Sequence, residues 1–351
     1  MFRCRVVFDH VSKLGLWWDS HDAASLVLYL SPSCCSCRGV IKIYSEQDFP
    51  KYLPRLNSLY DDLFTGGKGF RARLVQKVGE RLSATSELLQ LLAQTVEFIH
   101  NASLLHDDLI DRSILRRGKP AAWTKYSPEY AVLAGDYLLA RVMVNLSSHG
   151  NIRLVQYTAE VISDLLEGEW LQDSVIRDFD VNLEKLDRIH NLKTASLFKW
   201  CLRSPFYALK RDDGSLHQTL EKLGQILGSL FQRSDDLLDY DVRNDEGKAI
   251  LGDLKSGYLN SFAAYLVQDL SSEKRMEVVR SQTLPEFKNY FGGEKAFEAR
   301  VQAFDEMNQK QIDLYHHLLQ TLENQLQGQE RQLVADLRPL TDLLYWRRKP
   351  S

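Results

Sequence analysis

Two acidic clusters with the same spacing are the residues of this sequence most suited to chemistry. The first consists of Asp107, Asp108 and Asp111, and it ends an apolar segment with helical periodicity. On a helix, Asp107 and Asp111 project from one face, with Asp108 beside them. Like charges at this spacing destabilise a helix, so the cluster requires a compensating cation. Mg²⁺ is the expected ion, because it prefers carboxylate and phosphate oxygens.

The second cluster consists of Asp235, Asp236 and Asp239, and it also ends an apolar helical segment. With 47 acidic residues among 351, one such triplet is expected by chance about 0.8 times per chain. A single cluster is therefore more simply read as a solvated acidic helix end. Two clusters that each end an apolar helix are far less expected. We predict that the two clusters face each other across a helical bundle and share metal ions.

Basic residues that suit phosphate lie near the first cluster. Arg116 and Arg117 follow it within about two helical turns, and arginine binds phosphate bidentately. A carboxylate cluster beside an arginine pair is what a metal–diphosphate complex requires. His100 lies two helical turns before Asp107, on roughly the same face. By itself, His100 is more simply read as a core histidine.

A second basic segment lies further upstream. Gly66 and Gly67 end a predicted helix, and Lys68 and Arg71 follow them. Glycine lets a backbone approach a ligand closely, and the nearby cations suit phosphate. The alternative interpretation is a helix stop followed by a basic, solvated helix start.

Composition and patterning indicate an all-α protein. The net charge of −3 argues against a general nucleic-acid binder, and no run of 18 apolar residues occurs. Gly and Pro are sparse, and no sustained β-alternation is present, so the chain is predicted to be almost wholly helical. We expect residues 41–351 to form a single all-α domain.

The first 40 residues differ from the rest. They hold four of the five cysteines, Cys4, Cys34, Cys35 and Cys37, without a second Cys/His pair at zinc spacing. We expect residues 1–40 to be a poorly ordered or non-native extension, which would arise from an upstream start codon. Cys201 lies in an apolar run and is predicted to be a core thiol. This use of cysteine suits a reducing cytoplasm.

From about residue 41 to the C-terminus, an ordered series of motifs resembles the trans-isoprenyl diphosphate synthases of the polyprenyl synthetase family, in particular its medium- and long-chain members. Besides the two acidic clusters, the series comprises Gly66-Gly67-Lys68 with Arg71, Arg116-Arg117-Gly118-Lys119-Pro120, Glu167-Gly168-Glu169, Lys193-Thr194, Phe231-Gln232 and Gly247-Lys248. The resemblance implies an isoprenoid-synthase-type helical bundle around a central active-site cavity, and a homodimer.

The resemblance also implies a role for individual residues. Isopentenyl diphosphate would be bound by Lys68, Arg71, His100 and Arg117. The allylic diphosphate would be bound by Arg116, Lys193, Thr194, Gln232 and Lys248. Three Mg²⁺ ions per active site would have Asp107, Asp111 and Asp235 as leading ligands and Asp108, Asp236 and Asp239 in support. The catalytic set would be Asp107, Asp111, Lys193 and Asp235.

The implied enzyme is a prenyltransferase. It would condense isopentenyl diphosphate head-to-tail with an allylic diphosphate, giving an all-trans polyprenyl diphosphate and diphosphate. Ala102 and Ser103, small residues about one turn before Asp107, favour a medium or long chain, because an aromatic at the position of Ala102 blocks the cavity in the family. The alternatives are a short-chain (C15 or C20) synthase, a terpene cyclase-like enzyme of the same fold, and a non-catalytic partner subunit.

Four positions depart from the family pattern. Gly69 and Ala72 replace a basic residue and a proline, and Tyr258 stands where a second phosphate-facing lysine is usual. Arg233 replaces an apolar residue and needs a partner or solvent. The basic tail Trp346-Arg347-Arg348-Lys349 is interpreted as a solvated terminus, with transient membrane contact for product release as the alternative.

Overall fold

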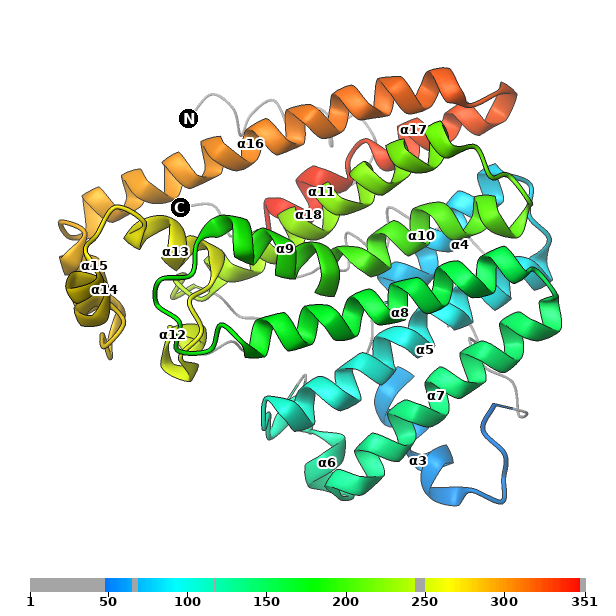
Figure 1. Ribbon diagram of the computed structural model, residues 1–351, viewed down its shortest axis with the longest axis horizontal. Coiled ribbons are helices and arrows are strands. Elements are labelled where there is room, and N and C mark those ends of the chain that lie inside the picture. Colours follow the sequence, from blue (N-terminus) through cyan, green and yellow to red (C-terminus); the bar gives the residue numbers. More distant parts are fainter. Residues whose placement is uncertain (1–47, 65–68, 117, 244–249, 348–351) are drawn as a thin grey trace.

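The computed structural model describes residues 48–64, 69–116, 118–243 and 250–347, which are almost wholly helical (Figure 1). Two-residue strands β1 (Leu115–Arg116) and β2 (Lys119–Pro120) pair antiparallel. The helices are α3 (Pro54–Phe64), α4 (Phe70–Arg81), α5 (Ser86–Ile110), α6 (Ala122–Lys125), α7 (Pro128–His149), α8 (Ile152–Asp173), α9 (Leu183–Lys193), α10 (Ala195–Ala208), α11 (Gly214–Leu238), α12 (Gly252–Ser256), α13 (Ser261–Val267), α14 (Ser272–Val278), α15 (Leu284–Tyr290), α16 (Glu294–Gln325), the 3₁₀ turn η1 (Gly328–Arg331), α17 (Gln332–Leu337) and α18 (Leu340–Tyr345).

Side-chain caps define where the helices that carry the acidic clusters begin. Thr85 accepts a hydrogen bond from the backbone N–H of Leu88 at the start of α5, and Asp213 accepts one from Leu216 at the start of α11. Each cap satisfies a backbone donor that has no partner within the helix. Both helices are 25 residues long, and both run toward the same end of the bundle, which also carries α12 (Figure 1). The acidic clusters therefore lie at one end of the molecule.

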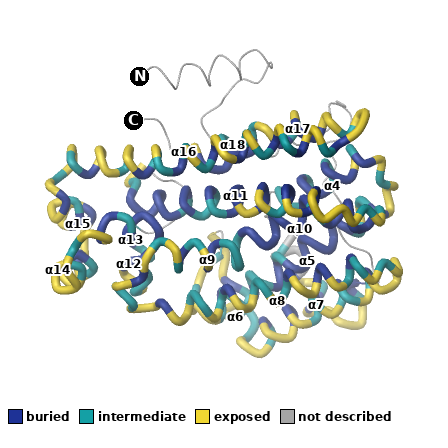
Figure 2. Tube along the Cα trace, turned by 45° about the horizontal axis from the view of Figure 1, so that its top comes forward, coloured by how far each residue is buried: buried dark blue, intermediate teal, exposed yellow. Residues whose placement is uncertain are grey.

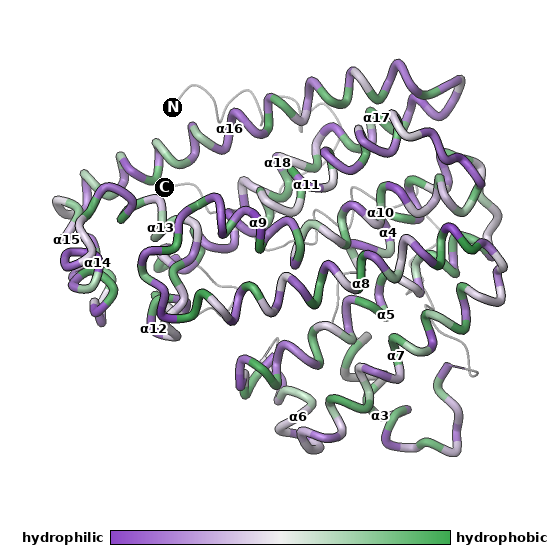
Figure 3. The backbone as a smooth tube through the Cα atoms, in the orientation of Figure 1, coloured by the Kyte–Doolittle hydropathy of each residue, from purple (hydrophilic) through white to green (hydrophobic). Residues whose placement is uncertain are grey.

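Helix α10 lies at the centre of the bundle. It packs against α4, α5, α8, α9 and α11, and its large side chains Phe198, Trp200 and Phe206 are buried. Figure 2 shows buried residues concentrated on α10, α11 and α5, with exposed residues along the outer helices. Hydrophobic and hydrophilic residues alternate along α16, which covers α11 with its apolar side (Figure 3). The framework that positions both clusters is thus built around one buried helix.

A glycine allows α11 to approach the start of α10. A Cβ atom at Gly228 would lie 2.3 Å from the Cα atom of Ala195, so no other residue fits without a shift of the helices. The close approach places Gln232, one turn after Gly228, beside Thr194.

No helix in the described ranges combines the length and hydropathy that crossing a bilayer requires. Cys201 is a buried free thiol, in agreement with the prediction, and the other four cysteines lie outside the described ranges.

Arg233, the buried charge that departs from the family pattern, has its partner on α9. Its Nη2 atom donates to both carboxylate oxygens of Asp187, at 2.7 and 2.9 Å, and its Nη1 atom donates to Asn308 Oδ1 on α16 at 2.6 Å. Asn308 Nδ2 in turn donates to the Tyr345 hydroxyl at 3.0 Å. The expectation that Arg233 needs a partner is confirmed, and the network joins four helices.

We expect Asp187→Asn to destabilise the protein more than Arg233→Met does. The Arg233 side chain is 7% exposed and that of Asp187 is 43% exposed, so only the loss of Asp187 leaves a buried charge uncompensated. The expected losses in free energy of unfolding are about 3 kcal/mol for Asp187→Asn and about 1 kcal/mol for Arg233→Met. Urea denaturation of both variants measures this order, and the reverse order would contradict it.

Candidate active site

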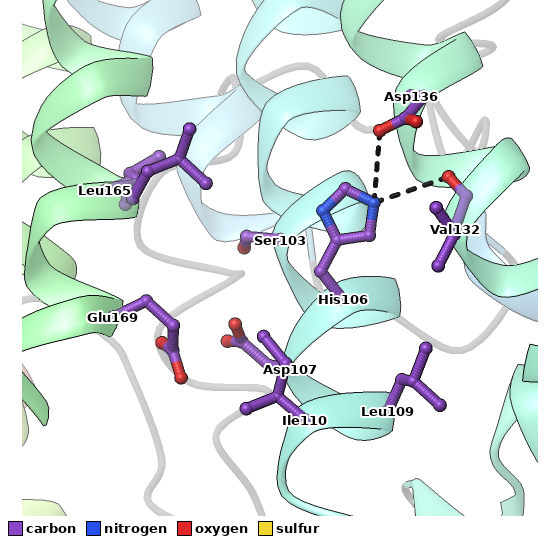
Figure 4. A pocket seen from close by; sticks show the side chains of 10 residues that line it. Ser103, His106, Asp107, Leu109, Ile110, Val132, Asp136, Leu165 and Glu169 are labelled. Atoms are coloured by element: carbon purple, nitrogen blue, oxygen red, sulfur yellow. Dashed lines mark hydrogen bonds and ion pairs between the residues drawn. The ribbon is translucent and has the colours of Figure 1, made fainter. Parts of the chain in front are cut away.

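The first acidic cluster is completed by residues from α8 and α9. The Lys193 Nζ atom lies 3.7 Å from Asp107 Oδ2 and forms an ion pair with Glu169. Figure 4 shows Asp107 and Glu169 on facing helices, with their carboxylates turned toward each other. Three helices therefore bring two carboxylates and one ammonium group together at the end of α5.

The electrostatics of this cluster indicate a shortage of positive charge. Burial raises the pKa of Asp107 to about 7; the Lys193 charge lowers it, and the Glu169 and Asp111 charges raise it further. Burial also raises the pKa of Asp111. For Lys193, burial favours the neutral amine, but Asp107 and Glu169 outweigh burial and raise its pKa. Partly buried carboxylate oxygens that lack countercharge suit a hard divalent cation, so the residues present fit Mg²⁺. In the described ranges, however, no three His, Cys, Asp or Glu side chains are already arranged to hold a metal ion.

Two consecutive residues connect the first acidic cluster to the second. Lys193, the last residue of α9, reaches Asp107, and the next residue, Thr194, donates from Oγ1 to Gln232 Oε1 at 3.1 Å. Gln232 Nε2 then donates to Asp236 Oδ1 at 3.0 Å. The junction between α9 and α10 therefore lies between the two clusters and contacts both.

In the second cluster, two of the three carboxylates accept hydrogen bonds from the segment that follows α11. Asp236 Oδ2 accepts from the backbone N–H of Ser261 at 2.9 Å and from its hydroxyl at 2.5 Å. Asp239 accepts from the backbone N–H groups of Gly252 and Asp253, at 2.9 and 3.3 Å. These two aspartates thus hold the chain after α11 in place, while their predicted supporting contact with metal stays a prediction.

His190 lies beside this cluster without supplying charge. Its Nε2 atom is 4.0 Å from Asp236 Oδ2, and the ring is buried. Burial lowers the pKa of His190 to about 4, so the ring is neutral near pH 7.

The predicted diphosphate-binding residues divide into four groups. Arg71 and His100, which were predicted to share the isopentenyl diphosphate site, lie together, with Arg71 Nη1 3.3 Å from His100 Nε2. Arg116 is paired with the first acidic cluster, because its Nε atom donates to Asp108 Oδ1 at 2.8 Å. Lys193, Thr194 and Gln232 form the junction between the two clusters described above. Lys68, Arg117 and Lys248 lie outside the described ranges.

A cavity of about 260 Å³ opens beside the first cluster. Its lining is mostly apolar, with Asp107 and Glu169 at one side and His106 paired to Asp136 at 3.5 Å at another (Figure 4). It is lined by Ser103, His106, Asp107, Leu109, Ile110, Val132, Asp136, Leu165, Leu166 and Glu169. Of the two residues predicted to limit chain length, Ser103 lines this cavity, whereas Ala102 is 0% exposed and lies in the core.

Three residues near the site received no role from the sequence. Glu169 belongs to the Glu-Gly-Glu motif, and this motif is the sequence feature that could have identified it as a site residue. Tyr258 faces acidic groups: burial raises its pKa, and the charges of Asp236, Asp253 and Glu169 raise it further, so its phenol stays neutral. Arg347 corrects the interpretation of a solvated terminus, because its side chain is 14% exposed and its Nη2 atom lies 2.7 Å from Asp235 Oδ1. No local sequence pattern indicates that contact.

The helical bundle is also the fold of known prenyl diphosphate synthases. A decaprenyl diphosphate synthase from Rhodobacter capsulatus superposes with a TM-score of 0.71 at 25% identity, covering 93% of this chain and 95% of that one. The family model described as polyprenyl synthetase matches residues 53–289. The chain therefore belongs to the polyprenyl synthetase family.

Curated relatives agree with this assignment. Decaprenyl-diphosphate synthase subunit 1 of Schizosaccharomyces pombe is 38% identical over 298 residues, which is 72% of this chain and 76% of the relative. Solanesyl-diphosphate synthase 2, chloroplastic, of Oryza sativa subsp. japonica is 34% identical over 237 residues, or 65% of this chain. The chain spans 58% of that relative's length, and between 51% and 59% of several others.

We expect Gly168→Ala to destabilise the protein, because Gly168 sets the distance between the helices that carry Glu169 and Lys193. An added Cβ atom would lie 2.7 Å from the backbone nitrogen of Lys193. The expected loss is about 1–3 kcal/mol in free energy of unfolding, measured by urea denaturation. The matched control is Gly214→Ala at the start of α11, where nothing lies within 4 Å of the added atom. Equal stability of the two variants would contradict the assigned role of Gly168.

Proposed function

We propose that this protein is a prenyltransferase that condenses isopentenyl diphosphate head-to-tail with an allylic diphosphate, giving an all-trans polyprenyl diphosphate of medium or long chain and diphosphate. The observation that carries this proposal is the junction between α9 and α10. There, Lys193 contacts the first acidic cluster and Thr194 connects to the second, beside an apolar cavity. Relatives named decaprenyl, solanesyl and octaprenyl diphosphate synthase support it.

Dependence on magnesium is a general property of this family. We propose that Asp107, Asp111 and Asp235 are the leading ligands, with Asp108, Asp236 and Asp239 in support, and that three ions bind per active site. When bound, Mg²⁺ would neutralise the charge that develops on a departing diphosphate.

The chain's own residues have three tasks in this reaction. Lys193 places a permanent positive charge beside Asp107, where it can also stabilise the allylic diphosphate. Thr194 and Gln232 orient that diphosphate, and Arg71 with His100 holds the diphosphate of isopentenyl diphosphate. Apolar residues such as Leu165 and Val132 line the cavity proposed for the prenyl chain, and an apolar surrounding of this kind is what the allylic cation requires. The proton lost after condensation goes to the released diphosphate, so we assign no protein base.

We further propose that the protein is a homodimer. On α7 and α8, large apolar side chains are exposed, among them Leu133, Val144, Leu166 and Trp170. Surfaces of this kind are typical of contacts between subunits. A cytoplasmic location and transient membrane contact during product release remain predictions.

The direct test is incubation of the purified protein with Mg²⁺, labelled isopentenyl diphosphate and farnesyl or geranylgeranyl diphosphate. Elongated products are expected, and EDTA should abolish them. Asp107→Asn should lower the rate by about 10²–10³-fold, because a ligand to the charge-neutralising metal is lost. Asp136→Asn is the matched control, since Asp136 lines the same cavity from α7 and is predicted to bind no metal.

Two other outcomes would contradict the proposal. Failure to elongate any allylic primer would favour a non-catalytic partner subunit. A cyclic hydrocarbon product would favour the terpene cyclase-like alternative, in which the isopentenyl diphosphate residues would be idle.

We expect Ser103→Phe to shorten the product by at least one isoprene unit, because the ring would fill part of the cavity that Ser103 lines. The Ser103→Ala variant should keep the wild-type product, since its side chain is smaller still. Chromatography of the dephosphorylated products measures both. An unchanged distribution in Ser103→Phe would show that the prenyl tail does not occupy this cavity.

A further inference from the structure

Arg347, which follows α18, lies against the second acidic cluster. Its Nη2 atom donates to Asp235 Oδ1 at 2.7 Å and to the Phe231 carbonyl at 3.3 Å, and its guanidinium carbon lies 4.5 Å from the centre of the Phe231 ring. Its Nε atom donates to the Leu344 carbonyl at 3.1 Å. Hydrogen bonds and ring contact together hold the guanidinium over the last turns of α11.

The segment that carries Arg347 makes further contacts with α11 and α16. The Ser234 hydroxyl donates to the Tyr345 carbonyl at 2.8 Å, and the Tyr345 hydroxyl donates to Asp305 Oδ1 at 2.7 Å. Helix α18 also packs directly on α11 and α16. Contacts between helices that are distant in sequence therefore position Arg347 beside Asp235.

Arg347 contacts Asp235, which is the proposed leading metal ligand of the second cluster. Asp236 and Asp239 already accept hydrogen bonds from Ser261, Gly252 and Asp253. A guanidinium that donates to Asp235 Oδ1 draws on the same carboxylate charge that a metal ion needs, and the two positive charges repel each other. Each therefore weakens the binding of the other.

We propose that Arg347 is an intramolecular competitor of the divalent cation at Asp235, so that metal binding displaces the guanidinium and loosens residues 340–347. This inference rests on the proposed function only for the presence of a metal at Asp235. It makes Arg347 a residue that sets the metal affinity of the site and couples metal binding to the position of the C-terminal segment. The size of this effect depends on how often Arg347 contacts Asp235. If the contact is present about nine-tenths of the time, the apparent metal affinity is about tenfold weaker than in a protein that lacks the contact.

The first test measures Mn²⁺ binding to the full chain, without substrate, by electron paramagnetic resonance. Arg347→Gln should tighten one class of Mn²⁺ site about tenfold, and Arg347→Lys should lie between that variant and the wild type. The matched control is Arg338→Gln, which removes a charge from an exposed side chain between α17 and α18. In an Asp235→Asn background, Arg347→Gln should have no effect, because the shared ligand is gone.

The second test follows amide hydrogen exchange of residues 340–347 in the wild-type protein as Mn²⁺ is added. Displacement of Arg347 should speed exchange in this segment, and this measurement needs no variant to fold. If the contact is only structural, Arg347→Gln should lower the melting temperature and leave the Mn²⁺ affinity unchanged or weaker. Amide exchange of residues 340–347 in the wild type should then not respond to Mn²⁺. Those results would overturn the proposal even if the protein elongates prenyl chains. An altered Mn²⁺ affinity in a protein that does not elongate them would overturn the proposed function alone.

Discussion

The crowding of carboxylates at the C-terminal end of α5 is the constraint on which the site depends. Asp107, Asp111 and Glu169 lie close enough that burial and mutual repulsion raise the pKa of Asp107 to about 7, even with the Lys193 ammonium beside them. Cations that balance such a group of acids stabilise its charged form. Lys193 supplies part of that balance, and in the proposed function a divalent metal bound to diphosphate would supply the rest. The proposed chemistry uses the same interaction, since the charge that stabilises the acids also stabilises a departing diphosphate.

The bundle positions this charge through a few close contacts. Because α10 is buried on every side, its N-terminal end is fixed. The preceding residues Lys193 and Thr194 are held in place as a result. Gly168 and Gly228 let α8 and α11 approach the two sides of this junction more closely than any larger residue allows. The acidic clusters, far apart in sequence, are thereby joined through two adjacent residues. A misplacement of either helix would separate the lysine from the acids it neutralises.

Much of this arrangement was predictable from the sequence. Helical periodicity and the repeated aspartate spacing indicated the all-α class and both acidic clusters, because a helix places residues four apart on one face. The same spacing could not identify the partners. Asp236 is bound by Ser261, and Arg233 by Asp187, through contacts between separate helices that no local pattern encodes. Ala102 and Ser103 are adjacent and both small, yet only Ser103 reaches the cavity, since neighbouring positions on a helix point in different directions.

The central claim is that the two clusters jointly bind metal and diphosphate, and a crystal structure with Mn²⁺ and an unreactive allylic thiolodiphosphate tests it most directly. We expect anomalous scattering peaks bonded to Asp107 and Asp111 on one side and Asp235 on the other, with the diphosphate between them and near Lys193. We also expect the prenyl tail to enter the cavity lined by Ser103 and Leu165. A structure with the analogue bound elsewhere, or with no metal at either cluster, would contradict this claim.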